Sequence, residues 1–262
     1  MTSTNQTLQL FAEALPLRFS DQGSGRTFLI LHGGAGPASM AGLADALAGT
    51  GRAIVPTHPG FAGQPRPQWF RSVGDLALAY LALLERLDAR EVVLVGNSFG
   101  GWIAAEMALR GSPRVAGLVL LCAAGIDPAP GGRAIVNPVN LAPAERAAFA
   151  FHDPRKFALT PPTPEGLATM AANQQAMLAY SGEHFMHDPT LRGRLGEMAL
   201  PALVIWGASD RIIDVEYGRR YAQSIPGARF EVVAEAGHFP QIEKLERVLG
   251  LMGELVVAEE AA

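Results

Sequence analysis

Short runs of apolar residues recur along this chain, and they limit its possible folds more than any other feature. Each run is bounded by turn-forming residues, and the runs occupy residues 27–31, 53–55, 92–95, 115–122 and 202–206. Because polar residues do not alternate strictly with the apolar ones, the runs are typical of strands buried on both faces of a parallel sheet. A sheet of this kind needs helices on both faces.

Segments with a helical period separate these runs. In residues 72–87, the apolar side chains of Leu76, Tyr80, Leu83 and Leu87 are spaced by three or four positions. This spacing predicts an amphipathic helix that covers the sheet. The alternation of strand and helix predicts a doubly wound α/β sheet, in which ligands bind beyond the carboxyl ends of the strands.

The alternation stops between Gly125 and about Leu200, where prolines, glycines and short helical stretches such as residues 164–180 replace the strand-like runs. We interpret this region as an insertion into a single core, which a chain of 262 residues is long enough to form. The expected organisation is a core from residues 1–125 and 199–262. Residues 126–198 form the insertion, called the cap segment below.

A G-x-S-x-G pattern lies at residues 96–100, directly after the apolar run 92–95 and before the helical run 102–109. This strand-turn-helix context is the one a nucleophile elbow requires, because the tight turn exposes a serine hydroxyl at the start of a helix. Small residues on either side of the serine avoid clashes with the adjoining strand and helix. Ser98 is therefore the candidate nucleophile.

A serine needs a base to take its proton, and the base needs a carboxylate to orient it. His238, in the sequence Glu-Ala-Gly-His-Phe-Pro, follows the strand-like residues 230–233 and is the best candidate for the base. Asp210 follows the apolar run 202–206 and is the preferred acid. Asp127, which follows the run 115–122, is its competitor.

With these residues in place, the chain resembles the α/β-hydrolases over nearly its whole length. Five segments carry the resemblance in the family's order: LHGG at 31–34, PGF at 59–61, GNSFGG at 96–101, WGASD at 206–210 and GH at 237–238. The resemblance implies a doubly wound, mostly parallel sheet with a helical cap inserted after the sixth strand. It also implies a catalytic triad of Ser98, His238 and Asp210.

The same resemblance implies an oxyanion hole made by the backbone N–H groups of Phe99 and Gly34. Preorganised donors of this kind stabilise the negative charge that develops on a substrate oxygen. Gly33, Phe99 and Phe239 are expected to contact the substrate. We expect no cofactor and no metal.

Several other polar residues have structural interpretations. We expect His32 to hold the oxyanion loop by hydrogen bonds, Asp214 to be a solvated or capping residue, and the single cysteine, Cys122, to be a small core residue. His184 and His187 do not form a convincing metal site because no third strong ligand lies nearby in the sequence.

Composition excludes several classes of protein. A chain that is 49% hydrophobic and 18% charged is not disordered, and a net charge of −4 does not favour nucleic acid as a partner. The sequence begins without a signal-peptide pattern, and it has no apolar run long enough to span a membrane. We expect a cytoplasmic monomer or homodimer whose partner is a small-molecule substrate.

The first functional hypothesis is a serine hydrolase that cleaves a small or medium ester or lactone through an acyl-enzyme. The second is a carbon–carbon bond hydrolase, because residues 96–101 and 32–34 are similar to the elbow and oxyanion loop of ring-cleavage-product hydrolases. Phe239 and Pro240 depart from that group, which usually has a tryptophan after the histidine. A substrate carboxylate bound by a cap arginine would favour this second hypothesis; the candidates are Arg133, Arg146 and Arg155. The third hypothesis is a ligand-sensing protein that keeps the hydrolase fold.

Overall fold

The computed structural model describes residues 4–138, 141–157 and 163–260. One mostly parallel sheet has the strand order β1-β2-β4-β3-β5-β6-β7-β8. Only the pairs β1/β2 and β2/β4 are antiparallel in this sheet. The strands are β1 (Thr4–Leu10), β2 (Leu15–Gly23), β3 (Thr27–Leu31), β4 (Arg52–Pro56), β5 (Val92–Asn97), β6 (Val115–Leu121), β7 (Ala202–Gly207) and β8 (Arg229–Val233).

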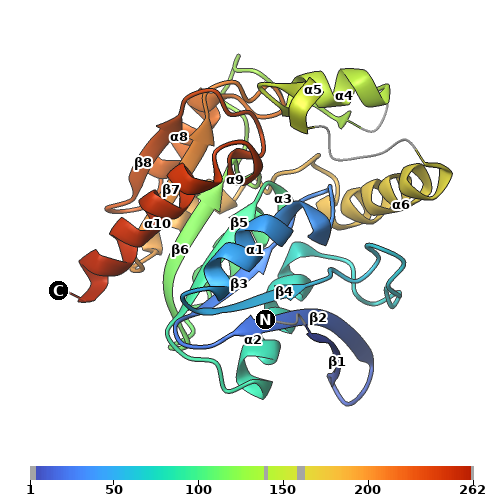
Figure 1. The fold of residues 1–262 in the computed structure, drawn as a ribbon, viewed down its shortest axis with the longest axis vertical. Helices are drawn as coiled ribbons and strands as arrows, with labels where there is room; N and C mark the ends of the chain where they lie inside the picture. Colours follow the sequence, from blue (N-terminus) through green and yellow to red (C-terminus); the bar gives the residue numbers. More distant parts are fainter. Residues whose placement is uncertain (1–3, 139–140, 158–162, 261–262) are drawn as a thin grey trace.

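Helices cover both faces of the sheet, as the apolar runs predicted (Figure 1). One face packs against α1 (Ala41–Ala48) and α10 (Leu245–Glu260), and the other against α2 (Val73–Arg86), α3 (Phe99–Ala108) and α8 (Val215–Gln223). Strand β5 has buried side chains on both faces of the sheet. Val93 and Val95 belong to the core on the side of α1 and α10, and Val92 and Leu94 belong to the core on the side of α2, α3 and α8. This two-sided burial explains why its sequence is apolar without alternation.

The predicted helix over residues 72–87 is α2. Ser72 is its N-cap residue, and its side chain accepts a hydrogen bond from the Asp75 backbone, while the Asp75 carboxylate accepts one from the Ser72 backbone. This capping box defines the start of the helix. Of the four predicted apolar positions, Leu76, Tyr80 and Leu83 are fully buried, whereas Leu87 is the C-cap residue after the helix and is half-buried.

The strands β1 and β2 were not predicted. They form an antiparallel hairpin at the edge of the sheet, in which Leu15, Leu17 and Phe19 of β2 are buried while the residues between them are more exposed. An edge hairpin of this kind alternates apolar and polar residues, so it lacks the continuous apolar run that identifies an internal parallel strand.

The region after β6, the sixth strand, is helical, as expected. It contains α4 (Pro143–Ala150), α5 (Pro154–Phe157), α6 (Pro164–Ser181), α7 (Leu191–Arg194) and the 3-10 helix η3 (Leu195–Glu197). The expected helical stretch at 164–180 is α6. Figure 1 shows α4, α5 and α6 set apart from the helices that cover the sheet. The division of the chain at residues 126 and 198 stays a prediction.

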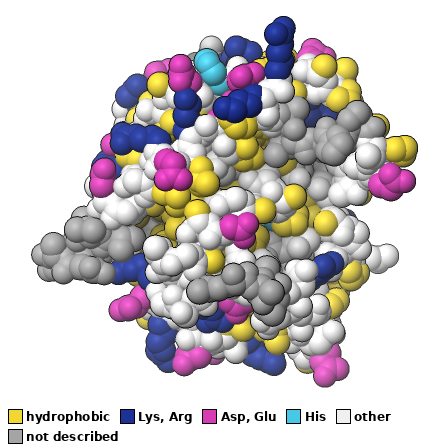
Figure 2. All heavy atoms as spheres, viewed as in Figure 1, with side chains coloured by type: hydrophobic (Ala, Val, Ile, Leu, Met, Phe, Trp, Pro, Cys, Tyr) yellow, Lys and Arg dark blue, Asp and Glu magenta, His cyan; other side chains and the backbone are white. Residues whose placement is uncertain are grey.

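On the face of the molecule shown in Figure 2, acidic and basic side chains are both spread over the surface. Hydrophobic side chains gather between the upper part of the molecule, which carries α4 and α5, and the part below it. Among the described residues, no helix has the length and apolar character needed to cross a bilayer.

Candidate active site

Ser98 lies at the turn between β5 and α3, with φ 54° and ψ −118°. A positive φ is uncommon for a residue other than glycine, and at this turn it is held by tight backbone packing. A Cβ atom on Gly96 would lie 2.3 Å from the carbonyl oxygen of Gly100, and one on Gly100 would lie 2.1 Å from that of Leu31. The glycines of the G-x-S-x-G pattern are therefore required by close backbone contacts around Ser98.

The structure brings together His238 and Asp210, which follow β8 and β7 in the chain. The His238 Nδ1–H donates to Asp210 Oδ2 at 2.8 Å, and both side chains are buried. The other carboxylate oxygen of Asp210 accepts hydrogen bonds from the backbone amides of Ile212 at 2.8 Å and Ile213 at 3.0 Å. With Nδ1 donating to Asp210, the second ring nitrogen of His238, Nε2, is left without a hydrogen and can accept one.

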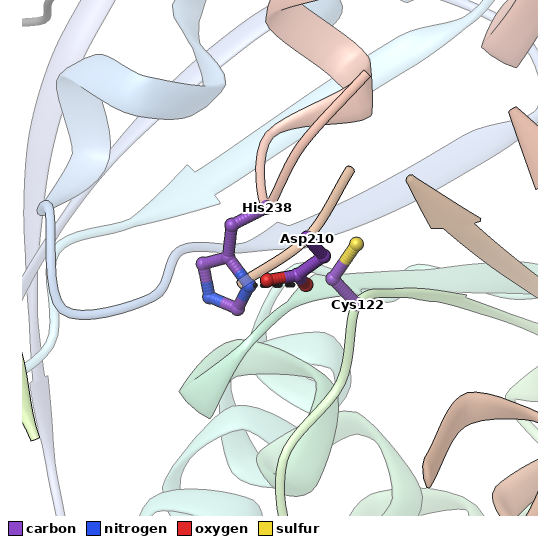
Figure 3. A group of neighbouring side chains, drawn as sticks. All are labelled: Cys122, Asp210 and His238. Atoms are coloured by element: carbon purple, nitrogen blue, oxygen red, sulfur yellow. Dashed lines mark hydrogen bonds and ion pairs between the residues drawn. The ribbon is translucent and has the colours of Figure 1, made fainter. Parts of the chain in front are cut away.

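Cys122 completes a cluster with these two residues (Figure 3), in which the carboxylate of Asp210 lies between His238 and the cysteine. One ligand atom from each of the three lies within 4.8 Å of the others. Burial raises the pKa of the Cys122 thiol well above its ordinary value, and the Asp210 carboxylate raises it further. A neutral thiol is a poor metal ligand, and two of the three groups already bond to each other, so this cluster does not fit a metal site.

Gly207 allows the segments that carry Asp210 and His238 to touch. A Cβ atom on Gly207 would lie 2.0 Å from the carbonyl oxygen of Gly237. The thiol of Cys122 also lies between these loops, since it accepts a hydrogen bond from Gly207 N at 3.4 Å and donates to Gly237 O at 3.7 Å.

Asn97 also holds the histidine, and sequence reasoning assigned it no role. Its Nδ2 donates to the carbonyl oxygens of His238 and Leu121, both at 3.0 Å. Asn97 directly precedes Ser98, so one residue links the elbow to the backbone of His238. Its place inside the G-x-S-x-G pattern was the only sequence signal for it.

A cavity of about 770 Å³ connects the elbow with the cap segment. Ser98 and His238 line it together, as do Gly34 and Phe239. Most of the remaining wall comes from apolar side chains of the cap segment and nearby loops, including Ile135, Val136, Leu167, Met170, Met177, Phe185 and Ile213. Its size lies in the range of small-molecule sites, and Ser98 and His238 are among its polar lining residues.

The loop after β3 lies directly against the elbow. A Cβ atom on Gly33 would lie 2.9 Å from the Cβ of Ser98, so the backbone of this loop approaches the nucleophile closely. Phe99 begins α3, where a backbone N–H has no partner within the helix. Its ring is fully buried and packs with Phe61 and Tyr180, so only the Phe99 backbone is left for the predicted substrate contact.

Two buried histidines support this loop. The Nδ1–H of His32 donates to Gly33 O at 2.8 Å, and its Nε2 accepts from His58 N at 3.2 Å. His58 donates from Nε2 to His32 O at 2.8 Å and accepts at Nδ1 from the Tyr80 hydroxyl. Burial lowers the pKa of His32 to about 4 and that of His58 well below its ordinary value, so both are neutral at pH 7. The structural role expected for His32 is confirmed.

Asp127, the competing candidate for the acid, and Asp214 form interactions with residues other than His238. Asp127 forms ion pairs with Arg192 at 3.0 Å and with Arg220 at 3.7 Å. Asp214 caps α8, because its side chain accepts a hydrogen bond from Tyr217 N at 2.9 Å.

The fold, the serine elbow and the paired histidine and carboxylate define the class of protein. The family model described as "Alpha/beta hydrolase family" matches residues 28–251, and the chain belongs to that family.

Two relatives match over most of their own length. A 2-hydroxymuconate semialdehyde hydrolase from Pseudomonas putida is 28% identical, over 97% of this chain and 95% of the relative. A 2-hydroxy-6-oxononadienedioate/2-hydroxy-6-oxononatrienedioate hydrolase from Paraburkholderia phymatum is 29% identical, over 89% of this chain and 88% of the relative.

Solved structures share the fold. A membrane phospholipase A described as a bacterial virulence factor superposes with a TM-score of 0.81 and 24% identity, over 99% of this chain and 87% of that one. A meta-cleavage product hydrolase from Pseudomonas fluorescens superposes with a TM-score of 0.75 and 23% identity, over 98% of both chains. At these identities the likeness supports the fold alone.

Proposed function

We propose that this hydrolase cleaves a carbon–carbon bond in a conjugated keto acid of the ring-cleavage-product type. The observation that carries the proposal is the end-to-end similarity to relatives named as hydrolases of such acids. Ester or lactone hydrolysis, the first hypothesis from the sequence, becomes the second candidate.

The site residues suggest a covalent mechanism. His238 Nε2 takes the proton of the Ser98 hydroxyl while the oxygen attacks the carbonyl carbon (aldehyde or ketone) next to the bond that is cleaved. The resulting oxyanion faces the backbone N–H groups of Phe99 and Gly34. When the carbonyl re-forms, the bond to the neighbouring carbon breaks. In the 2-keto tautomer of the substrate the electron pair of that bond is delocalised into the conjugated acid, and His238 gives the proton that it took from Ser98 to this leaving fragment.

Water then completes the reaction. His238 takes a proton from the water, which attacks the carbonyl carbon of the acyl group on Ser98, and the proton passes to the departing serine oxygen. Asp210 holds the tautomer of His238 and stabilises its charged form through both steps.

The position and the partners of Arg146, in α4, favour an acidic substrate. It lines the same cavity as Ser98, and its guanidinium donates to the carbonyl oxygens of Pro138 and Leu141, both at 3.1 Å, and contacts the sulfur of Met170. These partners, within the described part of the chain, are neutral. A substrate carboxylate is the natural complement of this charge.

Ester hydrolysis needs the same steps, with an alcohol in place of the carbon fragment. The apolar wall of the cavity favours it as the second candidate, because such a wall accommodates a simple acyl chain as well as a conjugated one.

The test compares the two substrate classes on one enzyme. We would measure kcat/KM for 2-hydroxymuconate semialdehyde and for p-nitrophenyl acetate, butyrate and octanoate. Intact mass after exposure to a fluorophosphonate would be recorded in parallel, with Ser98→Ala as the control. We expect one adduct on the wild type, none on the variant, and the higher kcat/KM on the keto acid.

Each other outcome selects a different function. Faster turnover of the esters would replace the proposal with the second candidate. No adduct and no turnover in a folded protein would favour a ligand-sensing role. Arg146→Leu should raise KM for the acid and not for the neutral esters, and an equal rise for both would remove the carboxylate argument.

A further inference from the structure

A second buried carboxylate lies beside the catalytic histidine. Glu243, at the end of α9 (Pro240–Glu243), is 8% exposed. Its Oε2 accepts from Gly237 N at 2.6 Å, while Oε1 accepts from His152 N at 3.0 Å and Asp153 N at 3.1 Å. The His152 amide is also 3.2 Å from Oε2. The carboxylate thus joins the backbone next to His238 to the backbone between α4 and α5.

The end of α4 makes further bonds to the same loops. His238 N donates to Ala150 O at 2.7 Å. Arg211, next to Asp210, donates from its backbone to Phe149 O at 3.2 Å and from its side chain to Ala148 O at 2.7 Å. The last carbonyl groups of a helix have no partner within it, and here those of α4 are satisfied by residues adjoining the base and the acid.

The backbone of Gly237 is in close contact with the end of α4. A Cβ atom on Gly237 would lie 2.3 Å from Ala150 O and 2.9 Å from the carbonyl carbon of the same residue. A movement of the chain between α4 and α5 must therefore displace Gly237 and His238 with it.

The chemistry at position 243 requires a carboxylate. All three of its partners are backbone N–H donors, and an ionised carboxylate is the side chain that offers acceptors on both oxygens. A glutamine in the same place would turn an NH₂ group toward one of these donors and leave a buried amide unsatisfied. An aspartate keeps the charge but is too short by one methylene to reach both segments.

We propose that Glu243 is a positioning residue for His238, which it holds in register with Ser98 by tying the histidine to the cap segment at residues 152–153. The role rests on the proposed function in one respect: it assumes that Ser98 and His238 perform the chemistry. Loss of the tie lets His238 shift relative to Ser98 while leaving the walls that contact the substrate in place.

The experiment compares wild type, Glu243→Gln and Glu243→Asp with the control Glu246→Gln, a glutamate that is exposed on the first turn of α10. We would measure kcat, KM, the rate of fluorophosphonate labelling of Ser98, and the thermal unfolding midpoint. Proton NMR would follow the hydrogen shared by His238 Nδ1 and Asp210 Oδ2.

In Glu243→Gln we expect kcat and the labelling rate to fall about 10- to 100-fold with KM changed by less than about threefold, since misplacing a reacting group by 1 Å costs rate on this order. The His238 resonance should shift or broaden. Glu243→Asp should lie between Glu243→Gln and wild type, and Glu246→Gln should match wild type in every measurement.

Two results would overturn the proposal. The first is a folded Glu243→Gln protein with kcat and the His238 resonance unchanged and only a lower unfolding midpoint. The second is a higher KM at constant kcat, which would place Glu243 in substrate binding. If Glu243→Gln does not fold, Glu243→Asp is judged by the same criteria. If wild type is neither labelled nor active, the proposed function fails, and the His238 resonance alone then decides the positioning role.

Discussion

Replacing Gly33 with alanine tests the contact between the oxyanion loop and the nucleophile. The new Cβ would lie 2.9 Å from the Cβ of Ser98 and 3.1 Å from the carbonyl oxygen of Asn97. Neither atom is at the far end of a flexible side chain. Relief to ordinary van der Waals contact requires the loop and the elbow to separate by about 0.5–1 Å, a strain typical of an overpacked site.

This separation would increase the distance between Ser98 and the loop that carries the Gly34 amide, and the rate depends on that distance. The elbow is held by the close contacts of Gly96 and Gly100, so the loop must yield, and it carries the Gly34 amide. One oxyanion donor contributes about 10²- to 10³-fold in rate, and a displacement near 1 Å costs on the order of 10²-fold. We therefore expect Gly33→Ala to lower kcat/KM about 100-fold and to destabilise the fold by about 1–3 kcal/mol.

The assay is kcat/KM on the preferred substrate together with urea unfolding. Gly42→Ala is the matched control, because Gly42 lies in α1 with nothing within 4 Å of a built Cβ. It should stabilise the protein by about 1 kcal/mol through helix propensity and leave kcat/KM unchanged. A Gly33→Ala enzyme with wild-type kcat/KM and stability would refute the close approach of loop and nucleophile.

Three further predictions concern other parts of the structure. Asp210→Asn should lower kcat about 10⁴-fold by reversing the tautomer preference of His238, whereas Asp127→Asn should keep activity; steady-state kinetics of both decides which carboxylate is the acid. The pKa of His32 is about 4 in the folded protein and near 6.5 in the unfolded chain, so the unfolded chain binds the proton first as pH falls. The free energy of unfolding therefore decreases as pH falls from about 6.5 to about 4. From pH 7 to 5 His32 alone should cost about 2 kcal/mol in the free energy of unfolding, and an equal fall in His32→Asn would assign the effect to another group. Ser72→Ala removes the capping box of α2 and should cost about 1 kcal/mol with kcat/KM unchanged, which chemical denaturation would measure.

The positions of the candidate site residues were predictable because each depends on local sequence. A serine at a strand-to-helix turn needs glycines at fixed offsets, and these offsets are visible without a structure. Asp210 follows the apolar strand β7 and His238 follows β8, its parallel neighbour, so parallel topology places them at one edge of the sheet.

Glu243 and Asn97 were not assigned roles because their partners are distant in sequence. Glu243 bonds to residues 90 positions and more before it, and Asn97 to a residue 141 positions after it. Both bond to backbone groups, which a residue carries whatever its side chain. A single sequence carries no pattern for such contacts. The hairpin of β1 and β2 differs, because Leu15, Leu17 and Phe19 alternate with polar or more exposed residues, a pattern that a criterion of continuous apolar runs does not identify.

The cap segment of this enzyme contacts the cavity and the sheet core through different groups. Its cavity wall is built from side chains, such as those of Met170, Met177 and Leu167. Its bonds to the residues beside the acid and the base use mainly the carbonyl groups of Ala148, Phe149 and Ala150. A substitution that reshapes the wall leaves those carbonyls in place as long as α4 stays helical. A proline or an insertion within its last turn would move them, and His238 with them, because the contact at Gly237 leaves no room for adjustment. Substrate preference is thus separable from catalytic geometry across most of the cap segment, and the two are coupled at the end of α4.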